Sequence, residues 1–231
     1  MTWDLELTKR LQHGASRFEL QVSLRSAARR LVLFGPSGAG KSQTLKMIAG
    51  LVRPDGGRVR IGTRTLFDAD SGVNLSPQSR RLAFVFQDYA LFPHLTVRQN
   101  IAFALSGGWR NPRPRVHDAR VERWLETFQL PAVADHFPAQ ISGGQRQRTA
   151  LARALVTEPT ALLLDEPFAA LDGHLRQRLR EELAQVLATL NVPMLLITHD
   201  DADAQVLADE VVHLRAGRVV DAPQAREPAL A

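Results

Sequence analysis

A glycine-rich segment directly after a short apolar run is the feature that most restricts how this chain can fold. The apolar run covers residues 31–34 and is continuous, as in strands buried on both faces of a parallel sheet. The segment fits the pattern G-x-x-x-x-G-K-S and leads into a helical pattern over 42–51. With the residue after it, the segment is Gly35, Pro36, Ser37, Gly38, Ala39, Gly40, Lys41, Ser42 and Gln43. A strand, a glycine turn and a helix in this order predict a phosphate-binding loop.

The side chains of this loop favour a nucleoside triphosphate with its magnesium ion. Glycines let successive backbone N–H groups surround phosphate oxygens, and the helix adds the positive end of its dipole. Lys41 is expected to neutralise charge on the β- and γ-phosphates, and the hydroxyl of Ser42 to bind Mg²⁺. ATP and Mg²⁺ are therefore the predicted ligands. The alternative is a glycine turn that carries Lys-Ser by coincidence, and the flanking strand and helix argue against it.

A second apolar run, residues 161–164, ends in two acids. Asp165 stands at the end of the predicted strand, where it can reach the magnesium shell of a phosphate-loop ATPase. Glu166 follows it and is suited to polarise the attacking water as general base. An acidic turn that caps a strand would be the better interpretation if the pair stood alone. The phosphate-binding loop in the same chain favours the catalytic interpretation.

Composition excludes several classes of site and protein. The chain has no cysteine, which excludes disulfides and thiolate metal sites and is compatible with a reducing cytoplasm. No apolar run approaches the ~18–20 residues of a membrane-spanning helix, and the acidic start is unlike a signal peptide. The net charge is +5, with arginines densest at 110–123, and no basic run is interleaved with aromatic residues. This favours a solvated basic surface over nucleic-acid binding.

Strand and helix patterns alternate and predict an α/β fold with a mostly parallel sheet. Strands at 3–7 and 18–24, and a hairpin of 59–61 with 64–67, predict an antiparallel β-subdomain, followed by a loop over 68–81. Residues 89–157 predict a helical subdomain. The remaining expected elements are strands at 82–86, 161–164 and 194–197, a helix at 171–190, and a hairpin of 211–214 with 218–220. We predict a single ATPase domain over 1–231, without a C-terminal regulatory domain.

Further motifs occur in a fixed order along the chain. Gln87 directly follows the apolar run 82–86, and His199 stands in Thr198-His199-Asp200. Two more segments are Ile141-Ser142-Gly143-Gly144-Gln145 and Ala170-Leu171-Asp172. With the phosphate-binding loop and the two acids, these resemble the Q-loop, switch histidine, signature motif and D-loop of the ATP-binding cassette (ABC) ATPases. The resemblance covers residues 2–222, and its specificity lies in the combination of motifs.

The resemblance implies a head-to-tail dimer that binds two ATP molecules. The signature motif of one copy would complete the ATP site of the other, because its helix start forms a second anion site that one chain cannot fold onto its own phosphate loop. His199 would contact the γ-phosphate, and Gln87 would touch Mg²⁺ and sense a membrane partner. The implied catalytic residues are Glu166, His199 and Gln87, and the implied metal ligands are Ser42, Gln87 and Asp165. The nucleotide contacts outside the phosphate loop would be Ser142, Gly143, Gly144, Gln145 and Asp172.

Four positions depart from the family pattern. Gln43 stands where Thr or Ser usually touches the α-phosphate, and Ala169 replaces the usual Ser before the D-loop. Ile141 replaces the common Leu of the signature motif, a mild apolar exchange. Leu11 falls where an aromatic residue usually stacks on adenine, and Phe18 is the alternative source of a ring.

Among these ATPases the chain looks most like the molybdate importer subunits, on the segments 66–68, 72–77 and 80–95. Sulfate or thiosulfate, and then ferric iron, are the alternative cargoes. The implied partners are a second copy, integral-membrane permease subunits and, indirectly, a periplasmic solute-binding protein, with the chain peripheral to the cytoplasmic face of the inner membrane. Residues 88–105 would form the groove for a permease helix, through the apolar contacts Phe92, Pro93, Leu95 and Val97. The alternative for these four residues is ordinary packing within the helical subdomain.

Two other classes of protein share part of this pattern. The ABC ATPases of DNA repair, chromosomes and translation add coiled coils, zinc insertions or a second cassette, and this sequence has no heptad run, no cysteine and one cassette. A phosphate-loop kinase acts as a monomer and would not need the Ser-Gly-Gly-Gln motif at 142–145. Both are therefore weaker interpretations than a transport ATPase.

Overall fold

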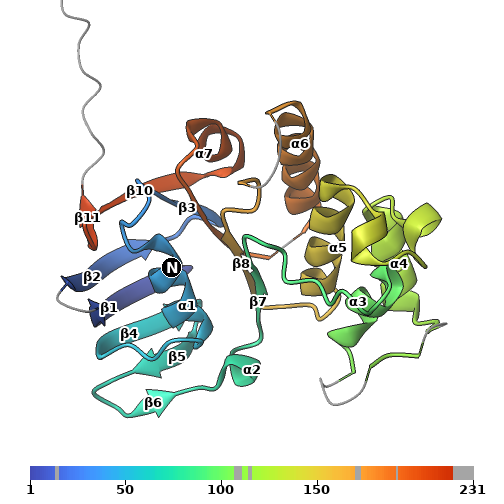
Figure 1. The fold of residues 1–231 in the computed structure, drawn as a ribbon. Coiled ribbons are helices and arrows are strands. Elements are labelled where there is room, and N and C mark those ends of the chain that lie inside the picture. Colours follow the sequence, from blue (N-terminus) through green and yellow to red (C-terminus); the bar gives the residue numbers. More distant parts are fainter. Residues whose placement is uncertain (14–15, 107–110, 114–115, 170–172, 191, 221–231) are drawn as a thin grey trace, which may run out of the picture. The chain divides into compact units, whose positions relative to one another are not determined.

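The computed structural model describes residues 1–13, 16–106, 111–113, 116–169, 173–190 and 192–220. Its contacts group the chain into two compact units, residues 1–80 with 197–231 and residues 81–196. Both combine strands with helices, which confirms the predicted α/β class (Figure 1). None of the described helices has both the length and the apolar character needed to span a bilayer. The single domain over 1–231 stays a prediction.

The first unit is built on strands in the order β6-β5-β4-β1-β2-β11-β10-β3. In its antiparallel part, alternation directs Leu5, Leu7, Leu20 and Val22 into the core. The strands of this unit are β1 (Trp3–His13), β2 (Ser16–Ser26), β3 (Arg30–Phe34), β4 (Gly56–Ile61), β5 (Arg64–Asp68), β6 (Val73–Asn74), β10 (Glu210–Arg215) and β11 (Arg218–Val220). Its helices are α1 (Lys41–Ala49), α2 (Pro77–Arg80) and α7 (Asp201–Leu207).

The second unit holds β7 (Leu82–Val85) and β8 (Ala161–Asp165), which run parallel. All five residues of β8 are buried, as expected for a strand of a parallel sheet that is covered on both faces. The unit also contains most of β9 (Met194–Thr198), which lies beside β8. Its helices are α3 (Val97–Phe103), α4 (Ala119–Thr127), α5 (Gly143–Leu155) and α6 (Gly173–Thr189), with short 3₁₀ turns at Pro131–Val133 and Pro138–Gln140.

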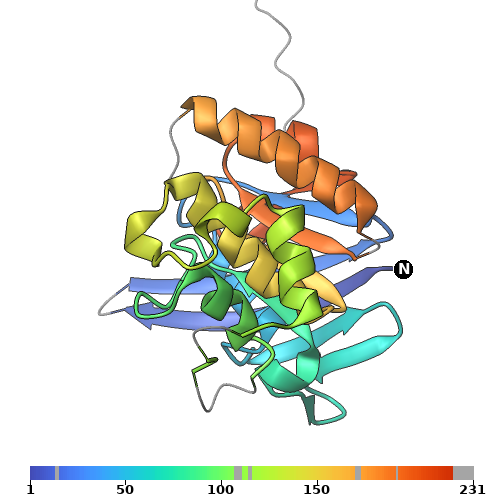
Figure 2. The same ribbon diagram turned by 90° about the vertical axis from the view of Figure 1, so that its right-hand side faces the viewer.

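The predicted helical subdomain over 89–157 falls within this second unit. Its described residues form helices and turns and no strand. The helices α3, α4 and α5 contact one another and lie together in both Figure 1 and Figure 2. α3 starts with a capping box, in which the hydroxyl of Thr96 accepts from the Gln99 amide and the Gln99 side chain accepts from the Thr96 amide.

The structure corrects three sequence-based expectations. β1 and β2 are longer than predicted, because every residue of Trp3–His13 has a partner on the facing strand. The predicted loop over 68–81 contains β6, which extends the sheet through pairing with β5, and the short helix α2. Helix α7 was not predicted. It starts where the Asp200 side chain accepts a hydrogen bond from the Ala202 amide at 2.9 Å.

Candidate functional site

The glycine turn after β3 is fixed by close contact with the β10–β11 hairpin. A Cβ on Gly35 would lie 2.1 Å from the carbonyl oxygen of Leu214, so a larger residue would force the backbone apart. The carbonyl oxygen of Ala39 accepts from the amide of Gly217 at 3.0 Å. Gly40 has a φ of 100°, a left-handed conformation that favours glycine. The predicted phosphate-binding loop is therefore held in one shape by its neighbours.

Lys41 opens α1 and directs its ammonium group back into this turn. Its Nζ donates to the carbonyl oxygens of Gly35 at 2.8 Å and Pro36 at 3.1 Å, and the residue is only 4% exposed. The N-cap residue of the helix is Gly40, which has no side chain to accept hydrogen bonds from the first turn. The N–H groups of that turn, at the positive end of the helix dipole, therefore face the loop. A buried cation beside a helix start is the arrangement of an anion-binding site.

Replacement of Lys41 by alanine is expected to weaken ATP binding by about tenfold or more, because a charge-assisted contact to phosphate is lost. Equilibrium titration with a fluorescent ATP analogue measures this. Lys46→Ala is the matched control, since it removes the same charge from the last turn of the same helix. We expect that control to bind like the parent. Equal affinities of Lys41→Ala and the parent would contradict the assignment of the loop.

An aromatic ring lies against the glycine turn. Phe18 on β2 is half-buried, and a Cβ on Gly40 would lie 3.3 Å from two of its ring atoms. Leu11 pairs with Phe18 directly across the β1–β2 ladder. Of the two candidates for the adenine contact, Phe18 therefore brings a ring next to the phosphate-binding loop.

His199 follows β9 and lies in the same unit as the glycine turn. The residue before it, Thr198, accepts a hydrogen bond through its carbonyl oxygen from the Gly35 amide at 3.3 Å. The Thr198 hydroxyl donates to Asp203 at 2.8 Å and accepts from the Asp200 amide at 3.1 Å. These contacts fix the backbone on both sides of His199, next in sequence to a residue that contacts the loop.

Gln87, Asp165 and Glu166 follow two neighbouring strands of the second unit. β7 and β8 are parallel, with Val85 opposite Leu164, so their carboxyl ends reach the same edge. Asp165 ends β8 and is 6% exposed, whereas Gln87 is exposed in the turn after β7. The sequence predicts the strands at 82–86 and 161–164, and the parallel pairing of β7 with β8 is what brings these three residues to one edge.

The signature segment forms the start of α5, as predicted. Ser142 is the N-cap, and its hydroxyl accepts from the Gln145 amide at 3.2 Å. The Gln145 side chain in turn accepts a hydrogen bond from the Ser142 amide at 2.9 Å, which completes a capping box. Gly143 and Gly144 form the first turn, where the helix dipole is positive.

For two other predicted nucleotide contacts, Asp172 and Gln43, the described part of the chain shows no such arrangement. Asp172 lies outside the described residues, together with the rest of the segment 170–172. The side-chain oxygen of Gln43 is buried and has no hydrogen-bond partner among the described residues.

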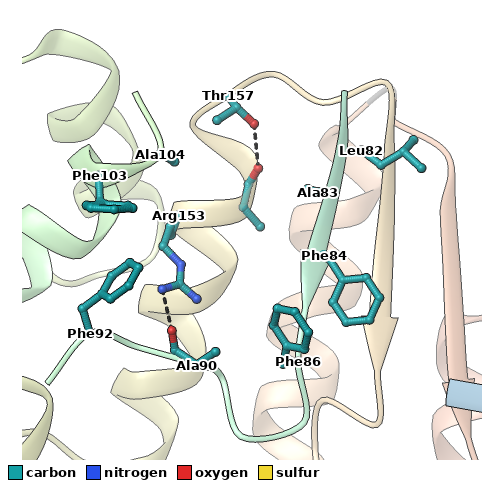
Figure 3. Close-up of a pocket in the computed structure, with 11 residues that line it drawn as sticks. Leu82, Ala83, Phe84, Phe86, Ala90, Phe92, Phe103, Ala104, Arg153 and Thr157 are labelled. Atoms are coloured by element: carbon teal, nitrogen blue, oxygen red, sulfur yellow. Dashed lines mark hydrogen bonds between the residues drawn. The ribbon is translucent and has the colours of Figure 1, made fainter. Parts of the chain in front are cut away.

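A pocket of about 410 Å³ adjoins the segment that follows β7 (Figure 3). It is lined by Leu82, Ala83, Phe84, Phe86, Ala90, Phe92, Phe103, Ala104, Arg153, Ala154 and Thr157. Four aromatic rings make the lining largely apolar, and the guanidinium of Arg153 lies 5.5 Å from the centre of the Phe92 ring. The predicted groove over 88–105 therefore coincides in part with a hollow of this unit.

Two of the predicted groove contacts are wrong. Leu95 and Val97 are 2% and 0% exposed, so their side chains are buried and do not line an open groove. Pro93 is exposed but does not line the pocket. Phe103 and Arg153, which do line it, were missed. Phe103 could have been found from its place at the end of the helical pattern that starts at 97, whereas nothing in the sequence marks Arg153.

Comparison with known proteins decides the family. The family model described as ABC transporter matches residues 19–169. The chain belongs to the ABC transporter family. The match covers more than half of the chain, and the fold of this ABC protein has counterparts among solved structures.

Relatives of this ABC protein include two sulfate/thiosulfate import ATP-binding proteins. CysA of Thermosynechococcus vestitus is 48% identical over 89% of this chain and 59% of its own length. CysA 2 of Agrobacterium fabrum is 46% identical over 82% of this chain and 54% of its own length. The molybdate/tungstate import ATP-binding protein WtpC of Archaeoglobus fulgidus is 43% identical over 96% of this chain and 88% of its own length. The chain thus spans less than two thirds of the two sulfate/thiosulfate proteins.

Two solved dimeric structures of the ABC cassette MJ0796 have the same fold. One is a post-hydrolysis state bound to ADP and Pi, with a TM-score of 0.77 and 29% identity. The other is described as a dimeric bacterial ABC transporter cassette, also with a TM-score of 0.77, at 30% identity. Each match covers 98% of this chain and 100% of the other.

Proposed function

We propose that this ABC protein binds and hydrolyses ATP as the energising subunit of an importer for a small oxyanion, sulfate or thiosulfate. The glycine turn carries the proposal. Its fixed shape, the buried ammonium of Lys41 and the uncapped helix start are what a triphosphate requires. A membrane-peripheral position on the cytoplasmic side follows from the import function of the relatives.

The proposed ligands of Mg²⁺ are the Ser42 hydroxyl, the Asp165 carboxylate and the Gln87 amide. All three supply oxygen, the donor type that Mg²⁺ takes, so the residues fit the ion. Bound Mg²⁺ would neutralise charge on the β- and γ-phosphates. Glu166 would then accept the proton of the attacking water, while His199 holds that water against the γ-phosphate. Phe18 is our choice for the adenine contact.

Two copies are proposed to act together in a head-to-tail, two-fold dimer. The capped start of α5 offers the N–H groups of a helix terminus, with Ser142, Gly143 and Gly144 as its first residues. These would meet the phosphates bound by the other copy, with Gln145 and Asp172 as further contacts across the interface. The dimeric assemblies of the related cassettes support this arrangement.

The apolar pocket beside the segment after β7 is the proposed docking site for a helix of the permease. Its aromatic lining suits an apolar side chain, and Arg153 can pair with a carbonyl or carboxylate of the incoming segment. A periplasmic solute-binding protein would act indirectly, by delivering the cargo to the permease. ATP-driven closure and hydrolysis-driven opening of the dimer would move that permease.

The comparisons favour sulfate or thiosulfate, which was the alternative cargo, over molybdate. The two CysA proteins are named for sulfate/thiosulfate and share 48% and 46% identity with this chain. WtpC is named for molybdate/tungstate and shares 43%, which keeps molybdate as the second candidate.

Uptake by the reconstituted complex tests this proposal. The chain is combined with its cognate permease and solute-binding protein in proteoliposomes loaded with ATP, and radiolabelled sulfate, thiosulfate and molybdate are offered in turn. We expect ATP-dependent accumulation of sulfate or thiosulfate, and none in a complex that carries Lys41→Ala. Preferential uptake of molybdate would reverse the choice of cargo, and the absence of ATP hydrolysis by the complex would contradict the function itself.

A further inference from the structure

The segment after β7 contains two consecutive non-glycine residues in the left-handed conformation. Tyr89 has a φ of 64° and Ala90 a φ of 44°. Such residues cost about 1–3 kcal/mol each and persist where neighbours hold them. Arg153 holds both residues, because its Nη2 donates to the Tyr89 carbonyl at 2.7 Å. Its Nη1 donates to the Ala90 carbonyl at 2.8 Å (Figure 3). One side chain of α5 therefore fixes this strained turn.

The side chain of Tyr89 connects the turn to the segment that follows β8. The residue is 4% exposed, and its hydroxyl donates to the carbonyl oxygen of Pro167 at 3.2 Å. Burial raises the pKa of the phenol above its ordinary value, so the hydroxyl keeps its proton and stays a donor at neutral pH. A buried tyrosine hydroxyl normally needs such a partner, and this one uses a backbone carbonyl 78 residues away.

Pro167 directly follows Glu166, whose own backbone is left-handed with a φ of 44°. The Ala169 amide donates to the Glu166 carbonyl at 3.1 Å and closes a tight turn around Pro167. Phe168, 1% exposed, anchors the turn in the core. The direction of the Glu166 side chain thus depends on a strained turn, and the hydrogen bond from Tyr89 holds the peptide next to it.

The same structure connects this turn to the pocket. Ala90, Phe92 and Arg153 all line it, and the Arg153 guanidinium lies over the Phe92 ring. A side chain that enters the pocket would meet Arg153, the residue that holds the Tyr89 and Ala90 carbonyls. Displacement of Arg153 would loosen the turn that carries the Tyr89 hydroxyl.

We propose that Tyr89 is a positioning residue, whose hydroxyl orients the turn bearing Glu166 and transmits to it the occupancy of the pocket through Arg153. This inference rests on the proposed function, because it takes Glu166 as the general base and a permease segment as the occupant. Tyr89 does not touch the reacting atoms. It acts by keeping the Glu166 carboxylate in the direction from which it can accept the proton of the attacking water.

The test is Tyr89→Phe, which keeps the ring and removes only the hydroxyl. We expect kcat for ATP hydrolysis to fall by about three- to tenfold, the size of one lost hydrogen bond, with KM for ATP unchanged. The stimulation of hydrolysis by the reconstituted permease is expected to fall as well. A loss of folding alone would instead lower the active fraction, which active-site titration with a trapped nucleotide detects.

Thr160→Val is the matched control. The Thr160 hydroxyl also donates to a backbone carbonyl, that of Arg81 at 3.1 Å, but at the amino end of β8 rather than the carboxyl end. We expect the parent kcat and the parent response to the permease. If Tyr89→Phe matches the parent in both, the inference is wrong while the proposed function stands. If the parent complex does not hydrolyse ATP, the proposed function itself fails.

A spectroscopic measurement keeps the inference testable even if the variant misfolds. Tyr89 is the only tyrosine in the chain, with a count of 1, so ring-labelled tyrosine gives a single NMR resonance. We expect that resonance to shift when the permease is added, and to shift in the same direction in Arg153→Gln. A resonance that stays in place on addition of a permease that stimulates hydrolysis would overturn the inference.

Discussion

Replacement of Glu166 by glutamine is expected to reduce ATP turnover by about 10²–10⁴-fold, the usual contribution of a general base. The amide has nearly the shape of the carboxylate but cannot accept the proton of the attacking water. ATP binding should persist, because the phosphate-binding loop is unchanged. Phosphate release gives the rate, and sedimentation in the presence of ATP should show a trapped dimer.

Glu158→Gln is the control for this variant. Glu158 is a second glutamate of the same unit, also left-handed with a φ of 51°, and it is exposed before β8. The same chemical change at a similar backbone conformation is expected to leave turnover at the parent rate. Hydrolysis by Glu166→Gln at the parent rate would show that another group takes the proton.

Replacement of Arg80 by methionine is expected to lower the free energy of unfolding by about 3 kcal/mol or more. Arg80 is fully buried at the end of α2, and its Nη1 donates to the carbonyl oxygens of Met47 and Ile48 at 2.8 and 2.7 Å. Its Nε donates to the Leu75 carbonyl at 3.0 Å. Methionine fills part of the space but leaves these buried acceptors without that donor.

The charge of Arg80 contributes to the same effect. Burial lowers the pKa of its guanidinium to about 10, so the group is still cationic at neutral pH. The cation faces the last carbonyls of α1, where the helix dipole is negative, while the other end of the same helix faces the phosphate-binding loop. Loss of Arg80 is therefore expected to loosen the helix on which that loop depends.

Urea denaturation of Arg80→Met and of Arg81→Met tests this expectation. Arg81 is the next residue and is exposed, so its replacement should change stability by no more than about 0.5 kcal/mol. Both variants remove one positive charge, which separates burial from net charge. Equal unfolding midpoints for the two variants would contradict the structural role of Arg80.

Local chemistry explains why so much of the candidate site could be read from the sequence. The positive φ of Gly40, the helix start at Lys41 and the capping box between Ser142 and Gln145 each depend on residues within a few positions of one another. The apolar runs 82–86 and 161–164 stop at the polar residues Gln87 and Asp165, within one residue of the observed ends of β7 and β8. These features depend on the identities of neighbouring residues, so a sequence pattern can detect them.

Only the tertiary structure decided which side chains donate hydrogen bonds to the backbone carbonyls of residues far away in the sequence. Tyr89 donates to the carbonyl of Pro167, Arg153 to those of Tyr89 and Ala90, and Arg80 to that of Met47, over separations of 78, 64, 63 and 33 residues. Every residue has a backbone carbonyl oxygen, so the sequence does not indicate which one will accept a given hydrogen bond. Only the folded structure decides which carbonyl is used. The sequence by itself determined that there is a phosphate-binding loop, a pair of acids and a capped signature helix, whereas the fold decided which buried side chains hold them in place.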